Sequence, residues 1–172
     1  MLRWRFLVVI PRSNVRDELE SWLSKAERVV LAGIGNPIRM DDYVGLRIVQ
    51  DLRGKLSDKV YLIECETVPE GFMQQIVDFN PTHVLLADAA LLGLKPGTSR
   101  LVEPVQLTTS PAFSTHLLPL RIFCDQVKEM TRAQVALLLV EPEKDDFGEG
   151  LTPSVEASAK EIGRMLLELL PR

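Results

Sequence analysis

Acidic side chains follow the predicted buried strands of this sequence. Asp41 and Asp42 come after the apolar run 28–35, and Asp88 lies near the end of the run 83–90. Open parallel sheets bind ligands just beyond the carboxyl ends of their strands, so these side chains are expected to meet at one rim. Like charges this close raise one another's pKa unless a cation lies between them, which favours a metal ion there. The further polar candidates at the same rim are Asn36, Glu64, Cys65, Glu66, Thr67, Glu141, Glu143, Asp145 and Asp146.

The glycine-rich turn GIGNPIRMDDYVG, residues 33–45, also has to be considered as a nucleotide-binding loop. A dinucleotide fingerprint needs G-x-G-x-x-G, and Ile38 occupies the position of the third glycine. Asp41 and Asp42 would repel a pyrophosphate at the N-terminus of the following helix, which otherwise favours an anion. The same helix terminus helps to keep a protein carboxylate ionised, as a metal ligand must be. The turn therefore indicates a metal site rather than a dinucleotide site.

The two histidines of the chain have different surroundings. His83 opens an apolar strand, which indicates a structural or surface role. His116 lies in the Pro- and Ser-rich segment SPAFSTHLLPL, where a histidine taken alone is more often a capping or packing residue than a ligand. Asp42, Asp88 and His116 are far apart in the sequence and form no local metal-binding motif. Spacing alone does not assign these three residues to a site.

Predicted strands and helices alternate along the chain. Thr152 followed by Pro153 is typical of a helix start, and an apolar stripe at helical spacing follows it. The alternation predicts an α/β fold, a three-layer α/β/α sandwich around a mostly parallel sheet of about five strands. We expect residues 28–172 to form a single domain. The predicted strands are 28–35, 60–64, 83–90, 99–103 and 133–141, and the predicted helices are 43–56, 70–79, 117–130 and the segment from 152.

The first 27 residues read as an N-terminal extension that we expect to be helical. Ser13 or Asn14 is a candidate N-cap, and the following residues place apolar side chains on one helical face. Two interpretations are compatible with this pattern: a helix that covers the flank of the sheet, and a contact surface for a partner. The apolar face consists of Val15, Leu19, Trp22, Leu23 and Ala26.

Composition argues against several functional classes. The chain has 20 Lys and Arg against 24 Asp and Glu, a net charge of −4, whereas nucleic-acid-binding proteins usually carry a basic excess. Cys65 and Cys124 lack CxxC spacing and fit a reduced protein better than a disulfide framework or a structural zinc site. The apolar run 6–10 is short for a secretory signal, and no run approaches the roughly 18 apolar residues of a membrane span. A soluble, cytoplasmic protein is expected.

Four segments, taken in order, resemble the maturation endopeptidases of [NiFe] hydrogenases over about residues 28 to 170. They are GIGNPIRMDDYVG, LLADAA, STHLLPL and GLTPSVEAS. The resemblance implies that Asp42, Asp88 and His116 form the metal-binding and catalytic site. It also implies that the metal is nickel already seated in the partner, the hydrogenase large-subunit precursor, from which a C-terminal extension is removed. Asp41 is expected to cap the helix that follows or to orient its neighbour Asp42.

Some positions depart from the pattern of that family. Met40 and Tyr43 stand where many members have glycine, and residues 64–67 read Glu-Cys-Glu-Thr in place of Asp-Gly-Gly-(Thr/Ser). These changes leave the three implied ligands in place. The changes affect how these loops are expected to bind the substrate, and hence which hydrogenase is processed.

Other functions remain as alternatives. A non-catalytic nickel-sensing binding protein of the same fold would use the same three ligands without cleaving a partner. Peptidyl-tRNA hydrolases share the opening GIGNP but continue with Thr-Arg-His-Asn, whereas residues 37–45 contain no histidine, and the net charge of −4 suits tRNA poorly.

For a protease, no serine, cysteine and histidine arrangement for covalent catalysis is evident. Hydrolysis by a water molecule activated near a metal or a carboxylate is expected instead.

Overall fold

A five-stranded sheet forms the centre of the molecule. The computed structural model describes residues 14–109 and 117–172. The strand order is β2-β1-β3-β5-β4, and β4 runs antiparallel to its neighbour β5 while the other pairs are parallel. The predicted strands are confirmed, with ends that shift by one or two residues. They are β1 (Val29–Ile34), β2 (Val60–Glu66), β3 (His83–Ala89), β4 (Ser99–Val102) and β5 (Gln134–Val140).

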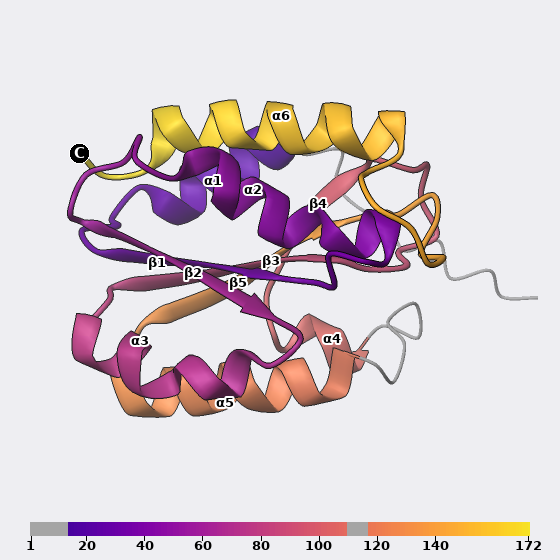
Figure 1. Cartoon of the computed structure of the whole chain (residues 1–172). Helices are drawn as coiled ribbons and strands as arrows, with labels where there is room; N and C mark the ends of the chain where they lie inside the picture. Colours follow the sequence, from indigo (N-terminus) through magenta and orange to yellow (C-terminus); the bar gives the residue numbers. More distant parts are fainter. Residues whose placement is uncertain (1–13, 110–116) are drawn as a thin grey trace, which may run out of the picture.

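Helices cover both faces of this sheet (Figure 1). One layer contains α1 (Val15–Leu23), α2 (Val44–Leu52) and α6 (Pro153–Leu169), and the other contains α3 (Met73–Phe79), α4 (Gln106–Thr109) and α5 (Leu118–Thr131). Each layer closes its own hydrophobic core against the sheet, because successive side chains of a strand point to opposite faces. The predicted three-layer α/β/α sandwich around a mostly parallel sheet is therefore confirmed.

Two of the predicted helices begin with a 3-10 turn. The turn η1 (Met40–Tyr43) precedes α2, and η2 (Pro69–Phe72) precedes α3. Helix α2 ends at Leu52, before the predicted end at residue 56, because Arg53 leaves the helical region and Gly54 follows with a φ of 74°. The turn η1 carries both aspartates of the glycine-rich segment.

Close packing of backbone against backbone places this turn over the ends of β1 and β3. A Cβ atom on Gly45 would lie 2.1 Å from the carbonyl oxygen of Ala87 and 2.3 Å from that of Ile34. Gly35 has a φ of 143°, and a Cβ atom on it would lie 1.8 Å from the carbonyl oxygen of Asp42. Glycine is required at both positions, because any side chain would push the turn away from the sheet. The two glycines therefore bring Asp42 to the end of β1.

Helix α1 packs on the same core as α2 and α6. Its residues Val15, Leu19 and Leu23 are buried, and Arg16 forms an ion pair with Glu168 of α6 at 2.5 Å. These contacts agree with the interpretation of the extension as a helix that covers the flank of the sheet. Its interpretation as a contact surface for a partner stays a prediction.

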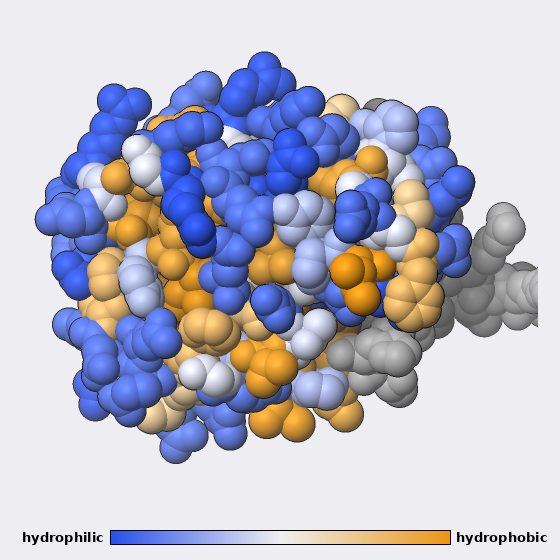
Figure 2. Space-filling model, in the orientation of Figure 1, coloured by the Kyte–Doolittle hydropathy of each residue, from blue (hydrophilic) through white to orange (hydrophobic). Residues whose placement is uncertain are grey.

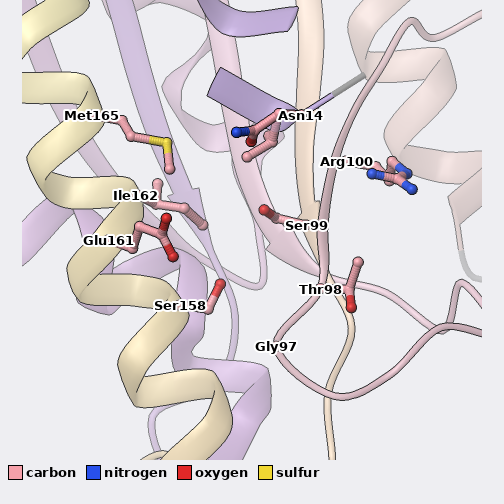
Figure 3. Close-up of a pocket in the computed structure, with 10 residues that line it drawn as sticks. Asn14, Gly97, Thr98, Ser99, Arg100, Ser158, Glu161, Ile162 and Met165 are labelled. Carbon is pink, nitrogen blue, oxygen red and sulfur yellow. The ribbon is translucent and has the colours of Figure 1, made fainter. Parts of the chain in front are cut away.

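A small cavity of about 230 Å³ lies between α1, β4 and α6 (Figure 3). Side chains of α6 line one wall, and the start of β4 lines the opposite wall. None of its lining residues is among the predicted site residues. They are Asn14, Val15, Gly97, Thr98, Ser99, Arg100, Ser158, Glu161, Ile162 and Met165.

Replacement of Leu19 with alanine is expected to lower the free energy of unfolding by about 2–5 kcal/mol, because it leaves a cavity in the core. Leu19 has no exposed surface. Urea denaturation measures the change, and Glu20→Ala on the exposed face of α1 serves as the matched control with an expected change within about 0.5 kcal/mol. Equal stabilities of Leu19→Ala and the unsubstituted protein would show that α1 is not docked on the core in solution.

Candidate active site

A cleft of about 420 Å³ opens at the carboxyl end of the sheet. It collects residues from the η1 loop, the end of β3, the start of α5 and the loop after β5. Asp42 and Asp88, two of the three residues that the sequence predicts for the site, both line it. The complete lining is Arg39, Asp42, Asp88, Ala89, Ala90, Leu91, Leu117, Pro142 and Asp145.

Asp42 is a half-buried carboxylate with one fixed oxygen. Its Oδ2 atom accepts a hydrogen bond from the backbone N–H of Asn36 at 2.9 Å, which orients the side chain within the glycine-rich turn. Burial raises the pKa of Asp42, and the charge of Asp145 raises it further. The Asn36 N–H and the charge of Arg39 oppose this rise in the pKa. Asp42 thus lies where its negative charge is not fully compensated by the protein.

The pKa of Asp88 is raised more strongly than that of Asp42. It lies near the end of β3, and its Oδ1 atom accepts a hydrogen bond from the backbone N–H of Ala89 at 2.8 Å. Burial and then the nearby charge of Asp42 raise the pKa of Asp88 to about 8, against the opposing effect of the Ala89 N–H. At neutral pH the two carboxyl groups therefore resist carrying two negative charges together. A cation between them would remove that conflict.

Asp41 forms hydrogen bonds with two segments far from it in the chain, partners that the sequence did not predict. Its carboxylate is fully buried and accepts hydrogen bonds from the backbone N–H groups of Glu143 (2.9 Å), Lys144 (2.9 Å) and Thr152 (2.7 Å). The predicted capping of the following helix by Asp41 is wrong, because its oxygens bind the segments after β5 and before α6 instead. Thr152 does hold the N-cap position of α6, as predicted, but its hydroxyl donates to Asp41 and forms no capping bond to the helix.

Two of the other predicted carboxylates of the rim have partners that do not line the cleft. Glu64 accepts hydrogen bonds from Gln50 and Arg53, and Glu141 accepts them from the backbone N–H groups of Leu92 and Leu94. Asp145, by contrast, lines the cleft, 3.9 Å from the guanidinium of Arg39. Arg39, which also lines the cleft, is not among the residues that the sequence predicts for the site. The sequence feature that could have indicated Arg39 is its basic side chain in the same loop as Asp42.

The structure tests the prediction for one of the two histidines, His83. His83 is 2 % exposed at the start of β3, and its ring centroid lies 4.9 Å from that of Trp22, which confirms a structural role. His116 lies outside the described residues. Within residues 14–109 and 117–172, no three potential ligands are close enough together to hold a metal ion. Leu117, which follows His116 in the chain, lines the cleft.

Comparisons with known proteins agree with this architecture. The family model described as Hydrogenase maturation protease matches residues 46–169. The chain belongs to the hydrogenase maturation protease family. It is 28% identical over 164 residues to a putative hydrogenase maturation protease of Methanocaldococcus jannaschii, covering 91% of this chain and 96% of that one. It is also 26% identical over 137 residues to the Hydrogenase 3 maturation protease of Escherichia coli K12, covering 80% and 87%.

A solved structure of the same family shares the fold. The [NiFe] hydrogenase maturation protease HycI from Thermococcus kodakarensis superimposes with a TM-score of 0.82 at 30% identity, covering 89% of this chain and 98% of that one. The protein is therefore a peptidase of hydrogenase maturation. The family match includes Asp88 but begins after Asp42, so the assignment of Asp42 to the site rests on the geometry of the cleft.

Proposed function

We propose that this protein is an endopeptidase that removes a C-terminal extension from the large-subunit precursor of a [NiFe] hydrogenase after nickel insertion. The observation that carries the proposal is the pair of aspartates, Asp42 and Asp88, in one cleft at the carboxyl end of the sheet. Membership of the hydrogenase maturation protease family supplies the class of substrate.

We further propose that Asp42, Asp88 and His116 recognise the nickel that the precursor presents. The donor set fits a divalent transition metal, because carboxylate and imidazole ligands bind such ions and three of them leave coordination positions open. The raised pKa values of Asp42 and Asp88 support the proposal, since an added cation favours their charged forms. His116 joins the set as a proposal, supported by the place of its neighbour Leu117 in the cleft.

The residues of the cleft suit hydrolysis by an activated water molecule. When bound, a divalent ion supplies polarisation of a carbonyl group or of water. Asp88, with a pKa of about 8, can hold or accept a proton near neutral pH, as a general acid or base must. Burial raises the pKa of both Cys65 and Cys124 to about 12, so neither thiol suits a nucleophile.

The decisive experiment is mass spectrometry of the large-subunit precursor after incubation with this protein. We expect loss of a C-terminal peptide from the nickel-loaded precursor and no loss from the nickel-free precursor. Binding to the loaded precursor without any loss of mass would instead support the nickel-sensing alternative. Absence of both binding and cleavage would contradict the proposed substrate.

The location in the cell is also a proposal. Both cysteines are buried and free, as expected in a reducing compartment, and we propose the cytoplasm. Among the described residues, no helix is long and apolar enough to cross a membrane.

A further inference from the structure

Three large apolar side chains stand exposed around the mouth of the cleft. Ile38 is 53 % exposed, Leu91 is 66 % exposed and Phe147 is 79 % exposed. Leu91 lines the cleft directly, and Ile38 and Phe147 belong to the two loops that contribute Arg39 and Asp145 to it. None of the three contributes to either hydrophobic core. Figure 2 shows apolar side chains interrupting the hydrophilic surface at the end of the molecule where the loop after β5 lies.

The two loops that carry Ile38 and Phe147 hold each other in place. The backbone N–H of Gly148 donates to the carbonyl oxygen of Ile38, and the N–H of Met40 donates to that of Gly148, both at 3.0 Å. The guanidinium carbon of Arg39 lies 5.4 Å from the centroid of the Phe147 ring. The Asp41 carboxylate also holds the loop after β5, because it accepts hydrogen bonds from the backbone N–H groups of Glu143 and Lys144. Phe147 is thus presented to solvent by an ordered backbone, and such preorganised aromatic side chains are typical anchors of protein interfaces.

Uncompensated acidic side chains flank this aromatic residue. Asp146 and Glu149 are exposed, and neither forms an ion pair within the described part of the chain. An apolar patch bordered by negative charge is complementary to an apolar patch bordered by basic side chains. The acidic border therefore indicates that a partner of this surface carries basic side chains around an apolar patch.

We propose that Ile38, Leu91 and Phe147, together with Asp146 and Glu149, form a docking surface for the folded body of the precursor. This inference rests on the proposed function, and it adds a second contact beyond the nickel and the cleaved peptide. Leu91 lines the cleft, and the loops that carry Ile38 and Phe147 contribute Arg39 and Asp145 to it, so a substrate whose tail enters the cleft comes close to this surface. The complementary surface on the precursor is an apolar patch with basic residues at its border, next to the point where the C-terminal extension leaves.

Steady-state kinetics with the nickel-loaded precursor test the docking surface. Phe147→Ala and Ile38→Ser are expected to raise KM about 10- to 100-fold each, while kcat stays within about twofold, because interface anchors contribute to binding and not to bond cleavage. The double variant Asp146→Asn, Glu149→Gln is expected to associate more slowly and with a weaker dependence on salt. Thermal denaturation of each variant should match that of the unsubstituted protein, since these side chains are exposed.

Met130→Ser is the matched control, because Met130 is 54 % exposed near the end of α5 and lies outside the cleft. Its KM should equal that of the unsubstituted protein. Unchanged KM values for Phe147→Ala and Ile38→Ser, beside normal cleavage by the unsubstituted protein, would overturn the docking surface alone. An equal rise of KM in Met130→Ser would also overturn it. Absence of binding and cleavage by the unsubstituted protein would overturn the proposed function and this inference with it.

Discussion

Replacement of Asp88 with asparagine is expected to abolish processing of the precursor while making the metal-free protein more stable. Burial and the charge of Asp42 raise the pKa of Asp88 to about 8, so ionisation of this carboxyl group opposes folding. Asparagine keeps the shape of the side chain and cannot ionise. It also cannot supply a negative ligand or hold the proton of a general acid. We expect the processing rate to fall by about 10²- to 10⁴-fold, the usual size of a general acid–base contribution.

The gain in stability has a definite dependence on pH. Because the folded pKa of Asp88 lies above the value near 4 of an unfolded aspartate, the folded state binds more protons between these two values. The contribution of Asp88 to the stability of the unsubstituted metal-free protein therefore falls as the pH rises from about 4 to about 8. We expect Asp88→Asn to exceed it by about 1–3 kcal/mol at pH 8 and to show little difference near pH 4.

Urea denaturation across this pH range and mass spectrometry of the precursor measure the two effects on the same preparation. Asp78→Asn is the matched control, because Asp78 is an exposed aspartate of α3 whose side chain accepts a hydrogen bond from Gln74. It should change neither the stability profile nor the processing rate. Normal processing by Asp88→Asn would remove Asp88 from the active site. Equal stability of the two proteins at pH 8 would show that Asp88 ionises in the fold without cost.

The sheet could be predicted from the sequence because its central strands are buried on both faces. β1, for example, has six buried residues in a row and reads as a continuous apolar run. Helix α4 (Gln106–Thr109) was missed because four residues are too few to show a helical period. The 3-10 turn η1 was missed for the same reason, although its position decides where Asp42 points.

The meeting of Asp42 and Asp88 at one rim could be predicted because both residues lie at or just beyond the carboxyl ends of parallel strands, and both line the cleft. The partners of Asp41 could not, because they include backbone N–H groups of residues 143 and 144, which carry no signal in the side-chain pattern. Met40 and Glu66 have φ values of 40° and 50°, a region that favours glycine. These left-handed conformations account for the glycines of the family pattern at both positions.

Replacement of Asp41 with alanine is expected to lower the free energy of unfolding by about 3–5 kcal/mol and to slow processing more than tenfold. The change leaves the part-buried N–H groups of Glu143 and Lys144 and the buried N–H group of Thr152 without their acceptor, and an unsatisfied buried group costs about 1–3 kcal/mol. Asp41→Asn should lower the free energy of unfolding nearly as much as Asp41→Ala, because the amide nitrogen of asparagine would face N–H donors where aspartate has a second oxygen. Urea denaturation measures the loss of stability.

Thr152→Val is the matched control for this loss. It removes the hydroxyl that donates to Asp41 but leaves the three backbone N–H donors and their acceptor in place. We expect it to lower stability by about 1 kcal/mol, the usual contribution of a single hydrogen bond, and to leave processing within about threefold. A loss in Thr152→Val as large as that in Asp41→Ala would show that the hydroxyl, and not the backbone, carries the energy.

The effect on processing separates a positioning role for Asp41 from a purely structural one. Asp41 follows Met40 and precedes Asp42 in one 3-10 turn, so the bonds that fix its carboxylate also fix where the Asp42 side chain enters the cleft. Processing is therefore to be measured at a low temperature and in the absence of urea, where Asp41→Ala is still folded. A slow reaction with a weakened affinity for nickel under these conditions follows from a displaced Asp42. A normal rate and affinity would mean that Gly35 and the Asn36 N–H hold Asp42 without help from its neighbour.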